Sequence, residues 1–247
     1  MSYPLEPDPA LGVFSTLLVL DGRPVELDSH LAQLRESVRA LYGAELPERA
    51  SELAIKQARG LAFGRVRLSC SPDGGREPRL EAVARAVEPT SVLPDAPLDL
   101  RMVHVDGWRG AHKWSDRRLL ARLEAEAAPA CALLVERDGT VLETTRANVF
   151  ALGDDGVLRT PPADGAILPG VTRASVIAIA REVGITVREE RVSPEALQGA
   201  REVFVTGSVR GVEPVRSLDG IALGRAGGLA ITIADALRRR WSDRVRA

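Results

Sequence analysis

Two kinds of apolar periodicity alternate along this 247-residue chain, and they limit its fold more than any other feature. Residues 13–20 and 65–70 show the β-rich runs and the every-second-residue alternation that are typical of strands. Residues 31–41 and 171–183 instead repeat apolar side chains every three or four positions, which is typical of helices. Both patterns occur on each side of the chain's middle, and the length allows one large domain or two modest ones.

The two patterns locate most of the expected elements. Expected strands cover residues 13–20, 23–27, 65–70, 80–87, 100–105, 132–136, 140–143, 148–152, 185–191 and 202–206. Expected helices cover residues 31–41, 47–60, 116–128, 171–183 and 225–240, and 194–197 is a helical turn. Asp28 or Ser29 is the expected cap of the first helix, and Gly43 ends it. The stretch 88–97 contains three prolines. It marks the crossing from a smaller N-terminal domain, 1–106, to a larger C-terminal domain, 107–247.

Charge and hydropathy exclude several classes of partner. The net charge is −1, so no basic field attracts nucleic acid. No apolar run approaches the ~20 residues that a membrane-spanning helix requires. The first eight residues carry prolines and acids and do not follow the order of a signal peptide. We therefore expect a cytoplasmic protein that binds neither nucleic acid nor membrane.

Cysteine and histidine give no sign of a metal site. Cys70 and Cys131 are far apart and lack ligand spacing, so both are expected to be buried thiols in a reducing compartment. His30, His104 and His112 likewise form no metal-binding pattern in the sequence. The expected chemistry is therefore free of metal.

Lysine is almost absent from the chain, which singles out Lys113. Only Lys56 and Lys113 occur among the 33 basic residues, and the other 31 are arginines. A guanidinium remains protonated under ordinary conditions, whereas a desolvated lysine amine can lose its proton and act as a nucleophile. Lys56 lies on a polar helix face and is expected to be a surface charge. Either Lys113 performs chemistry that arginine cannot perform, or it is, like Lys56, a lysine without a special role.

Three further segments carry polar groups that suit a ligand. In the first, the expected strand that ends at Glu143 is followed by a strand that opens with Asn148. In the second, Gly170 precedes a helix that begins with Val171 and Thr172, and such a helix start binds anions through its free N–H groups. In the third, residues 203–211 run from a buried strand into small residues. Each segment alone also fits an ordinary connection between elements.

Taken together, these segments supply what a phosphorylated pyridine aldehyde requires. Lys113 offers an amine for its carbonyl, Glu143 a carboxylate for the pyridine nitrogen, and the helix start at Thr172 a place for the phosphate. The lysine and the two motifs after it therefore favour one cofactor, pyridoxal 5'-phosphate.

The same residues resemble the fold-type IV pyridoxal-phosphate enzymes, which include branched-chain and D-amino-acid aminotransferases and 4-amino-4-deoxychorismate lyase. The resemblance extends from Gly12 to about Gly220 and is strongest from Lys113 onward. The segments that carry the resemblance are Lys113 with Arg117, Glu143 to Phe150, Ile167 to Arg173, and Glu202 to Val215. The resemblance implies the α+β fold of that class, which has two mixed α/β domains with the cofactor at the domain interface. It also implies a homodimer.

The resemblance also implies roles for individual residues. Lys113 is the expected covalent anchor of the cofactor and a carrier of protons at the substrate. The expected cofactor-binding residues are Lys113, Glu143, Asn148, Val171, Thr172, Gly207 and Ser208. Among them, Glu143 is expected to pair with the pyridine nitrogen, and the last four to form the phosphate cradle.

One position departs from the family pattern. The first helix reads His30-Leu31-Ala32-Gln33-Leu34, and relatives usually carry a phosphate-binding arginine in place of Gln33. Arg35, Arg65 or Arg67 are the candidates to replace that cation, and the sequence does not choose between them. The stretch before the first strand is also reduced, to Ala10-Leu11-Gly12.

The first strand favours one reaction within the family. Transaminases of this family typically follow the glycine before the first strand with an aromatic residue and an acid, whereas here Phe14 is followed by Ser15 and Thr16. Two hydroxyl residues are similar to the aminodeoxychorismate lyases, in which a hydroxyl could relay a proton to the departing enolpyruvate. Ser15 and Thr16 are both candidates, and Thr16 is the expected catalytic residue beside Lys113.

Three functions follow from the resemblance. The first is conversion of 4-amino-4-deoxychorismate to 4-aminobenzoate and pyruvate, a step toward folate. The second is an aminotransferase acting on branched-chain or D-amino acids and 2-oxo acids. The third is a non-catalytic relative with weakened cofactor binding, which the uncharged Gln33 keeps open.

Overall fold

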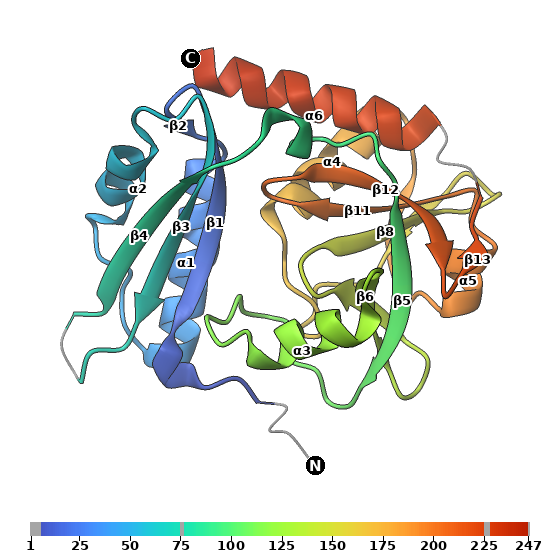
Figure 1. The fold of residues 1–247 in the computed structure, drawn as a ribbon, viewed down its shortest axis with the longest axis horizontal. Helices are drawn as coiled ribbons and strands as arrows, with labels where there is room; N and C mark the ends of the chain where they lie inside the picture. Colours follow the sequence, from blue (N-terminus) through green and yellow to red (C-terminus); the bar gives the residue numbers. More distant parts are fainter. Residues whose placement is uncertain (1–5, 75–76, 225–227, 247) are drawn as a thin grey trace. The chain divides into compact units, whose positions relative to one another are not determined.

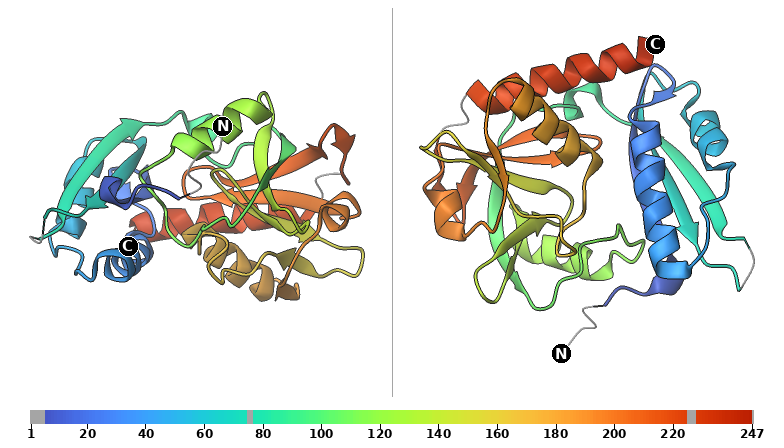
Figure 2. Two further views of the ribbon diagram at one scale, coloured as in Figure 1. Left: turned by 90° about the horizontal axis from the view of Figure 1, so that it is seen from below. Right: turned by 180° about the vertical axis from the view of Figure 1, so that it is seen from behind.

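The computed structural model describes residues 6–74, 77–224 and 228–246, and they form two compact units (Figures 1 and 2). The small unit consists of Glu6–Val92, His112–Arg117 and Arg238–Ala247. The large unit contains Leu93–Ala111 and Arg118–Leu237. The units therefore differ from the expected continuous halves 1–106 and 107–247. The difference arises because the strand at 98–105 pairs within the large unit, while the stretch around Lys113 pairs within the small unit.

The small unit contains an antiparallel four-stranded sheet of order β2-β1-β3-β4. Its elements are the turn η1 (Pro9–Leu11), β1 (Val13–Leu20), β2 (Arg23–Pro24), α1 (Leu27–Tyr42), α2 (Ala50–Ala58), β3 (Phe63–Ser71), β4 (Arg79–Ala86) and the turn η2 (Pro89–Ser91). Side chains alternate between the two faces of each strand. One face, including Val13, Leu17 and Leu68, packs against Leu34 and Val38 of α1.

Both helices of the small unit therefore cover the same face of its sheet, as the rear view in Figure 2 shows for α1. The opposite face, which we call the helix-free face, includes Phe14 and Thr16 of β1 and Arg67 and Ser69 of β3. These residues are neighbours because Thr16 is paired with Arg67 and Phe14 with Ser69. The register of β1 and β3 thus determines which side chains share that face.

The large unit is built on a nine-stranded sheet. Its elements are β5 (Leu98–Val105), α3 (Arg118–Ala127), β6 (Cys131–Glu136), β7 (Val141–Thr144), β8 (Asn148–Leu152), β9 (Leu158–Thr160), α4 (Val171–Glu182), β10 (Val187–Glu189), α5 (Pro194–Gln198), β11 (Glu202–Gly207), β12 (Gly211–Leu218), β13 (Ile221–Ala222) and the first part of α6 (Gly228–Arg246), up to Leu237. The strand order is β10-β9-β8-β11-β12-β5-β6-β7, and β13 pairs with β12.

Six strands of the large unit close into a ring. Because β7 also pairs with β8, the ring runs β8, β11, β12, β5, β6, β7 and returns to β8. Its inside holds a continuous apolar cluster that includes Leu133, Val149, Val205 and Val215. Side chains of opposite parity on the same strands face outward, where α3 and α4 pack. The outward face of β8 and β11 therefore lies beside α4.

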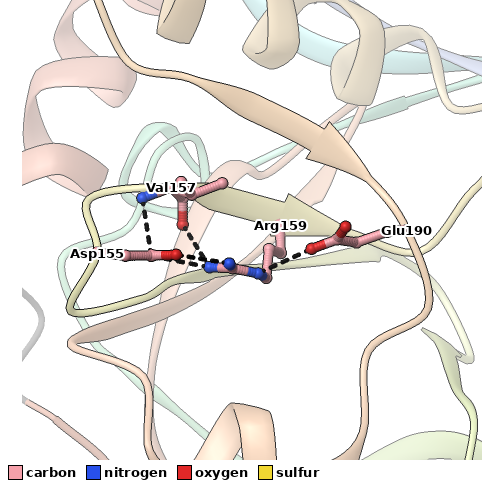
Figure 3. Close-up of polar contacts among 4 residues, drawn as sticks. All are labelled: Asp155, Val157, Arg159 and Glu190. Atoms are coloured by element: carbon pink, nitrogen blue, oxygen red, sulfur yellow. Dashed lines mark hydrogen bonds and ion pairs between the residues drawn. The ribbon is translucent and has the colours of Figure 1, made fainter.

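The start of α6 and the turn after β8 are held by carboxylates. Glu202 accepts hydrogen bonds from the backbone N–H groups of Leu229 (3.3 Å) and Ala230 (3.0 Å), which places a negative charge at a helix N-terminus. Beyond β8, Arg159 bridges Asp155 of the turn and Glu190 after β10 (Figure 3). Its Nε lies 2.9 Å from Glu190 Oε1, so one guanidinium joins two connections at the surface.

Several expected boundaries were wrong for local reasons. The second strand ends at Pro24 because α1 already begins at Leu27, and its N-cap is Glu26 in the left-handed region, so neither Asp28 nor Ser29 caps it. Strands β9, β12 and β13 were not expected, and Pro214 within β12 hides that strand in the sequence. The expected start of the last helix, 225, lies outside the described residues. Among the residues that the structure describes, no helix is long and apolar enough to span a membrane.

Candidate functional site

The segment that carries Lys113 extends the sheet of the small unit. The N–H of Phe14 donates to the carbonyl oxygen of Lys113 at 2.9 Å, and the N–H of Ser115 donates to the carbonyl oxygen of Gly12 at 2.9 Å. Val13 and Trp114 lie opposite each other in this antiparallel bridge. Gly12 has φ +83°, and a Cβ there would lie 2.3 Å from a backbone oxygen of β3, so only glycine fits. The backbone of Lys113 is therefore fixed by β1.

Alternation along this segment sends Lys113 to the helix-free face. Trp114 packs into the core beneath α1, and its neighbour His112 bonds Ser37 of α1, with Nδ1 3.0 Å from Oγ. The rings of His112 and Trp114 meet edge to face at 5.8 Å. Burial lowers the pKa of His112 from its ordinary value. His112 and Trp114 thus anchor the segment on the helix side, and Lys113 extends from the other side.

Two cations share the ring of Phe14 on the helix-free face. The guanidinium carbon of Arg67 lies 3.7 Å from the ring centroid, and the Nζ of Lys113 lies 5.4 Å from it. Arg67 also donates from Nε to Ser69 Oγ at 3.3 Å. Thr16 is the direct cross-strand partner of Arg67. The structure therefore brings Lys113, Thr16 and Arg67 to one face around Phe14.

A hollow of about 330 Å³ adjoins this group within the small unit. Arg67 and Arg79 contribute the positive charge of its lining, and Glu81 contributes one carboxylate. The remaining lining residues are Leu11, Ser69, Ser71, Val83 and Ser115. Two guanidinium groups and several hydroxyls make this hollow suitable for a carboxylate or another small anion.

Ser15 and Thr16, the two hydroxyl candidates of the first strand, lie on opposite faces. Ser15 is buried on the helix side, where its Oγ lies 2.8 Å from His30 Nδ1. Burial, with a smaller contribution from the charge of Lys113, lowers the pKa of His30 to about 3, so this histidine is neutral near pH 7. Of the two hydroxyls, only Thr16 therefore shares a face with Lys113.

Gln33 lies on the α1 face that meets the Lys113 segment. His30, Gln33 and Ser37 are three and four residues apart, so they share one side of the helix. Among the three arginines considered as its replacement, Arg35 and Arg65 are exposed. Arg67 is partly buried and held on Phe14. Arg67 is thus the candidate that the structure holds in a defined position, although this does not test a role toward phosphate.

In the large unit, Glu143 is held by a small polar network. Asn148 donates from Nδ2 to Glu143 Oε2 at 3.1 Å and to the carbonyl oxygen of Leu168 at 2.9 Å. The N–H of Leu168 donates back to Glu143 Oε2 at 3.2 Å. Gly110 lies against the same carboxylate, since a Cβ there would lie 2.9 Å from Glu143 Oε1. Three separate stretches of sequence therefore fix the orientation of one carboxylate.

The same network positions the start of α4. A Cβ on Gly170 would lie 2.2 Å from Asn148 Oδ1, so the close approach of these two residues requires glycine. Gly170 is the N-cap and offers no side-chain cap to the helix. The first N–H groups of α4, from Val171 onward, thus remain available to an anion.

Two buried hydroxyls near this helix start lack partners. Among the described residues, Thr172 Oγ1 and Thr206 Oγ1 make no hydrogen bond. Thr206 is the cross-strand partner of Asn148, so it lies on the β8–β11 face beside α4. Buried hydroxyls without partners are uncommon in folded proteins, and these two have hydrogen-bonding capacity for a ligand. With the uncapped helix, they fit a phosphate group.

The expected site residues thus divide between the units. Lys113 and Thr16 belong to the small unit, and the large unit holds the others: Glu143, Asn148, Val171, Thr172, Gly207 and Ser208. Gly207 is paired with Gly211 at the end of β11, and Ser208 follows it half-buried. The sequence reasoning missed Gly110 and Thr206. The tight packing at Gly110 leaves no signal in the sequence. Thr206 directly precedes Gly207, which is one of the expected cofactor-binding residues.

Comparison with known proteins identifies relatives over most of the chain. The family model of class IV aminotransferases matches residues 12–218. The branched-chain-amino-acid aminotransferase of Escherichia coli (strain K12) is 44% identical over 92 residues, which is 37% of this chain and 29% of that protein. The first relatives of known sequence are therefore matched over less than a third of their own length.

Solved structures match at the level of the whole fold. A hypothetical aminotransferase from Mycobacterium tuberculosis in its PLP-bound form has TM-score 0.81 and 26% identity, covering 94% of this chain and 89% of that one. A Legionella pneumophila protein whose assignment as a 4-amino-4-deoxychorismate lyase is provisional has TM-score 0.80. It is 24% identical and covers 94% of this chain and 91% of its own, so this similarity supports the fold alone.

These comparisons decide the family. They confirm the predicted fold type IV, the prediction of an enzyme, and pyridoxal phosphate as its cofactor. Members of the family act on small molecules. Since the family model covers most of the sequence and the solved relatives cover almost all of the fold, this chain belongs to the class IV aminotransferase family.

Proposed function

We propose that this protein is a pyridoxal-phosphate-dependent lyase that converts 4-amino-4-deoxychorismate to 4-aminobenzoate and pyruvate. The observation that carries the proposal is Thr16. It is the hydroxyl of the first strand that lies on the same sheet face as Lys113 and Arg67. A hydroxyl in that position can carry a proton without adding charge.

The residues available suit the cofactor. Lys113 would hold its aldehyde carbon covalently, and Glu143, oriented by Asn148 and Leu168, would hold its pyridine nitrogen. The N–H groups of Val171 and Thr172 and the unpartnered hydroxyl of Thr172 would bind its phosphate. Gly207 and Ser208 would complete that cradle. When bound, the cofactor supplies an electron sink for the pair released at the substrate carbon.

The chain's own groups would then move two protons. Once the substrate's amino group has taken its place on the cofactor, the freed amine of Lys113 would remove the proton from the ring carbon that bears that amino group. The bond between the ring and the enolpyruvyl oxygen breaks, and the ring becomes aromatic. The Thr16 hydroxyl would relay a proton to the departing enolpyruvate, which becomes pyruvate.

The hollow beside Arg67 supports this choice of substrate. Aminodeoxychorismate carries one carboxylate on the ring and another on the enolpyruvyl group. Arg67 and Arg79 both line the hollow and can bind carboxylates as charge-assisted pairs. A small apolar amino acid carries a single carboxylate and could occupy only one of these two guanidinium groups.

The deciding experiment follows the products. The protein, loaded with pyridoxal phosphate, is incubated with aminodeoxychorismate, and 4-aminobenzoate and pyruvate are measured. A lyase releases them in a 1:1 ratio with no amino acceptor present. Thr16→Val should reduce the rate by about tenfold or more, since general acid catalysis commonly contributes ~10²–10⁴. Absence of 4-aminobenzoate from the loaded wild type would contradict the proposal.

An aminotransferase is the second candidate, and family membership favours it, since the matched family model bears that description. It would convert the cofactor to its amine form with an amino donor alone and lose the visible absorption band. A non-catalytic relative is the third candidate, and it would give neither product.

We also propose, from the family resemblance, that the protein is a homodimer. Light scattering would test this.

A further inference from the structure

Three polar side chains form a row across the outward face of the ring of strands in the large unit. Glu143 of β7 is paired with Asn148 of β8, and Asn148 is paired with Thr206 of β11. Cross-strand partners point to the same side of a sheet, with Cβ atoms ~4.5–5.5 Å apart. The residues next to them in sequence, Val149 and Val205, belong to the cluster inside the ring. Thr206 therefore lies on the outward face, two strands and ~10 Å from Glu143.

The first turn of α4 meets this row at Asn148. Gly170, the N-cap of α4, approaches Asn148 so closely that a Cβ on the glycine would lie 2.2 Å from Asn148 Oδ1. Further along the same face, the rings of Phe150 and Phe204 stack with centroids 5.2 Å apart, and α4 packs against β11. The N–H groups at the start of α4 and the hydroxyl of Thr206 are therefore neighbours of one side chain, Asn148.

The hydroxyl of Thr206 has hydrogen-bonding capacity that the fold does not use. Thr206 is 2% exposed, and within the described part of the chain its Oγ1 makes no hydrogen bond. The same is true of Thr172 in the first turn of α4. By contrast, the buried Thr160 of β9 donates from Oγ1 to the carbonyl oxygen of Val149 at 2.8 Å. The large unit thus satisfies a comparable hydroxyl internally, but not the two that lie near the uncapped helix start.

We infer that Thr206 is a further ligand of the cofactor's phosphate, and that its hydroxyl donates to a phosphate oxygen beside those bound by the start of α4 and by Thr172. The inference rests on the proposed binding of pyridoxal phosphate in the large unit. Glu143, the partner of the ring nitrogen in that proposal, is at one end of the row, and Thr206 is at the other. The phosphate arm of the cofactor extends away from the ring nitrogen, so one molecule can engage both ends.

Two ligands that differ only in the phosphate isolate this contact. The unloaded protein is titrated with pyridoxal phosphate and with pyridoxal, and the ratio of the two Kd values gives the factor by which the phosphate tightens binding. Thr206→Val keeps the shape of the side chain and removes its hydroxyl. The factor should then fall about tenfold, the typical effect of one hydrogen bond to a charged group. Thr206→Ser keeps a hydroxyl and should retain most of the factor.

Two controls separate this contact from stability and from the amine of Lys113. Thr160→Val removes a buried hydroxyl that already has a partner, so it should lower the melting temperature and leave the factor unchanged. Inorganic phosphate forms no covalent bond with an amine, so its competition with pyridoxal phosphate reports the phosphate contacts alone. Thr206→Val should weaken the binding of inorganic phosphate by about tenfold as well.

The outcomes separate this inference from the proposed function. If the wild type binds pyridoxal phosphate no more tightly than pyridoxal, the proposed phosphate cradle at α4 fails, and the inference fails with it. If the wild type prefers the phosphorylated form but Thr206→Val leaves the factor unchanged, only the role of Thr206 is overturned. An equal loss for both ligands also overturns that role, because the side chain then serves the ring or the fold. Should Thr206→Val misfold, Thr206→Ala takes its place, and an unchanged factor again decides against Thr206.

Discussion

At the scale of single residues, Lys113 is the position on which the proposed chemistry depends. Lys113→Arg retains the positive charge on the helix-free face but removes the only group there that can bind an aldehyde carbon. We expect the fold to persist and the visible band of the loaded protein to be lost. Absorption spectra with circular dichroism would check both. Borohydride labelling at Lys56 instead of Lys113 would refute the assignment.

Glu143 allows a second test at the same scale. Glu143→Gln keeps the shape of the side chain and its contacts with Asn148 and Leu168, but it removes the negative charge. The cofactor should still bind, and turnover should fall by ~10² or more if electron withdrawal is lost, since each ~1.4 kcal/mol is a factor of ten. Steady-state kinetics at saturating substrate would measure the loss. An undiminished rate would mean that Glu143 only organises the loop before α4.

What the sequence could predict at this scale follows from residue type. Lys113 was found because lysine is rare in this chain, and Glu143 and Asn148 because a resemblance marked their segment. The hydrogen bond between Asn148 and Glu143 and the close packing of Gly110 against Glu143 could not be predicted. Both depend on how separate segments of the chain pack together. The alternation of β1 did separate Ser15 from Thr16 in principle. Only the observed core shows which of the two faces the helices.

At the scale of elements, a change at the start of α4 should affect the stability of the protein and its binding of pyridoxal phosphate in opposite directions. The hydroxyl of Thr172 is buried without a partner among the described residues. Thr172→Val should therefore leave the unloaded protein as stable or more stable, because an unsatisfied polar group is removed. It should weaken pyridoxal phosphate by about tenfold, the value of one hydrogen bond to a charged group, while pyridoxal is unaffected. Fluorescence titration and thermal unfolding would measure the two quantities. Equal loss for both forms of the cofactor would rule out a phosphate contact.

Helix α1 carries the departure at Gln33, and the reverse change tests it. Gln33→Arg places a cation on the α1 face that meets the Lys113 segment. If the phosphate lacks a cation, affinity for pyridoxal phosphate should rise by roughly ten- to a hundredfold, as a charge-assisted contact is worth ~1.5–3 kcal/mol. Binding of pyridoxal should not change. Unchanged or lower affinity for the phosphorylated form would mean that another arginine already fills the site.

The hydrogen bond between His30 of α1 and Ser15 of β1 allows a prediction of how stability depends on pH. The pKa of His30 is about 3 in the folded protein and near its ordinary 6.5 when unfolded, so the unfolded chain binds the extra proton. The stability that depends on neutral His30 is complete above pH 6.5 and is lost as the pH falls toward 3. Between pH 7 and 5, the wild type should lose about 2 kcal/mol more than His30→Gln. Urea unfolding at both pH values would measure this difference, and equal losses would show that His30 is not buried in its neutral form.

At the scale of the whole molecule, periodicity predicted the content of the fold better than its connectivity. Most strands and helices follow from local patterns, whereas the ring of strands in the large unit requires β7 to meet β8 and β12 to lie beside β5. Parallel pairing between β5 and β12, more than 100 residues apart in the chain, leaves no local signal. The same is true of the return of His112–Arg117 to the small unit. Long-range pairing is therefore what the sequence alone could not supply.

Synthesis on the ribosome gives the bridge between Gly12 and Ser115 a further meaning. Strands β1, β3 and β4 are complete once Ala86 has been made, but the start of β1 stays unpaired on one side until Ser115 follows. At ~5–20 residues per second, that interval lasts a few seconds. An uncovered strand edge in a nascent chain can pair with other chains, so the start of β1 is open to such pairing during this interval. The segment that ends this interval also carries Lys113, so the proposed cofactor anchor joins the small unit in the same step that covers the start of β1.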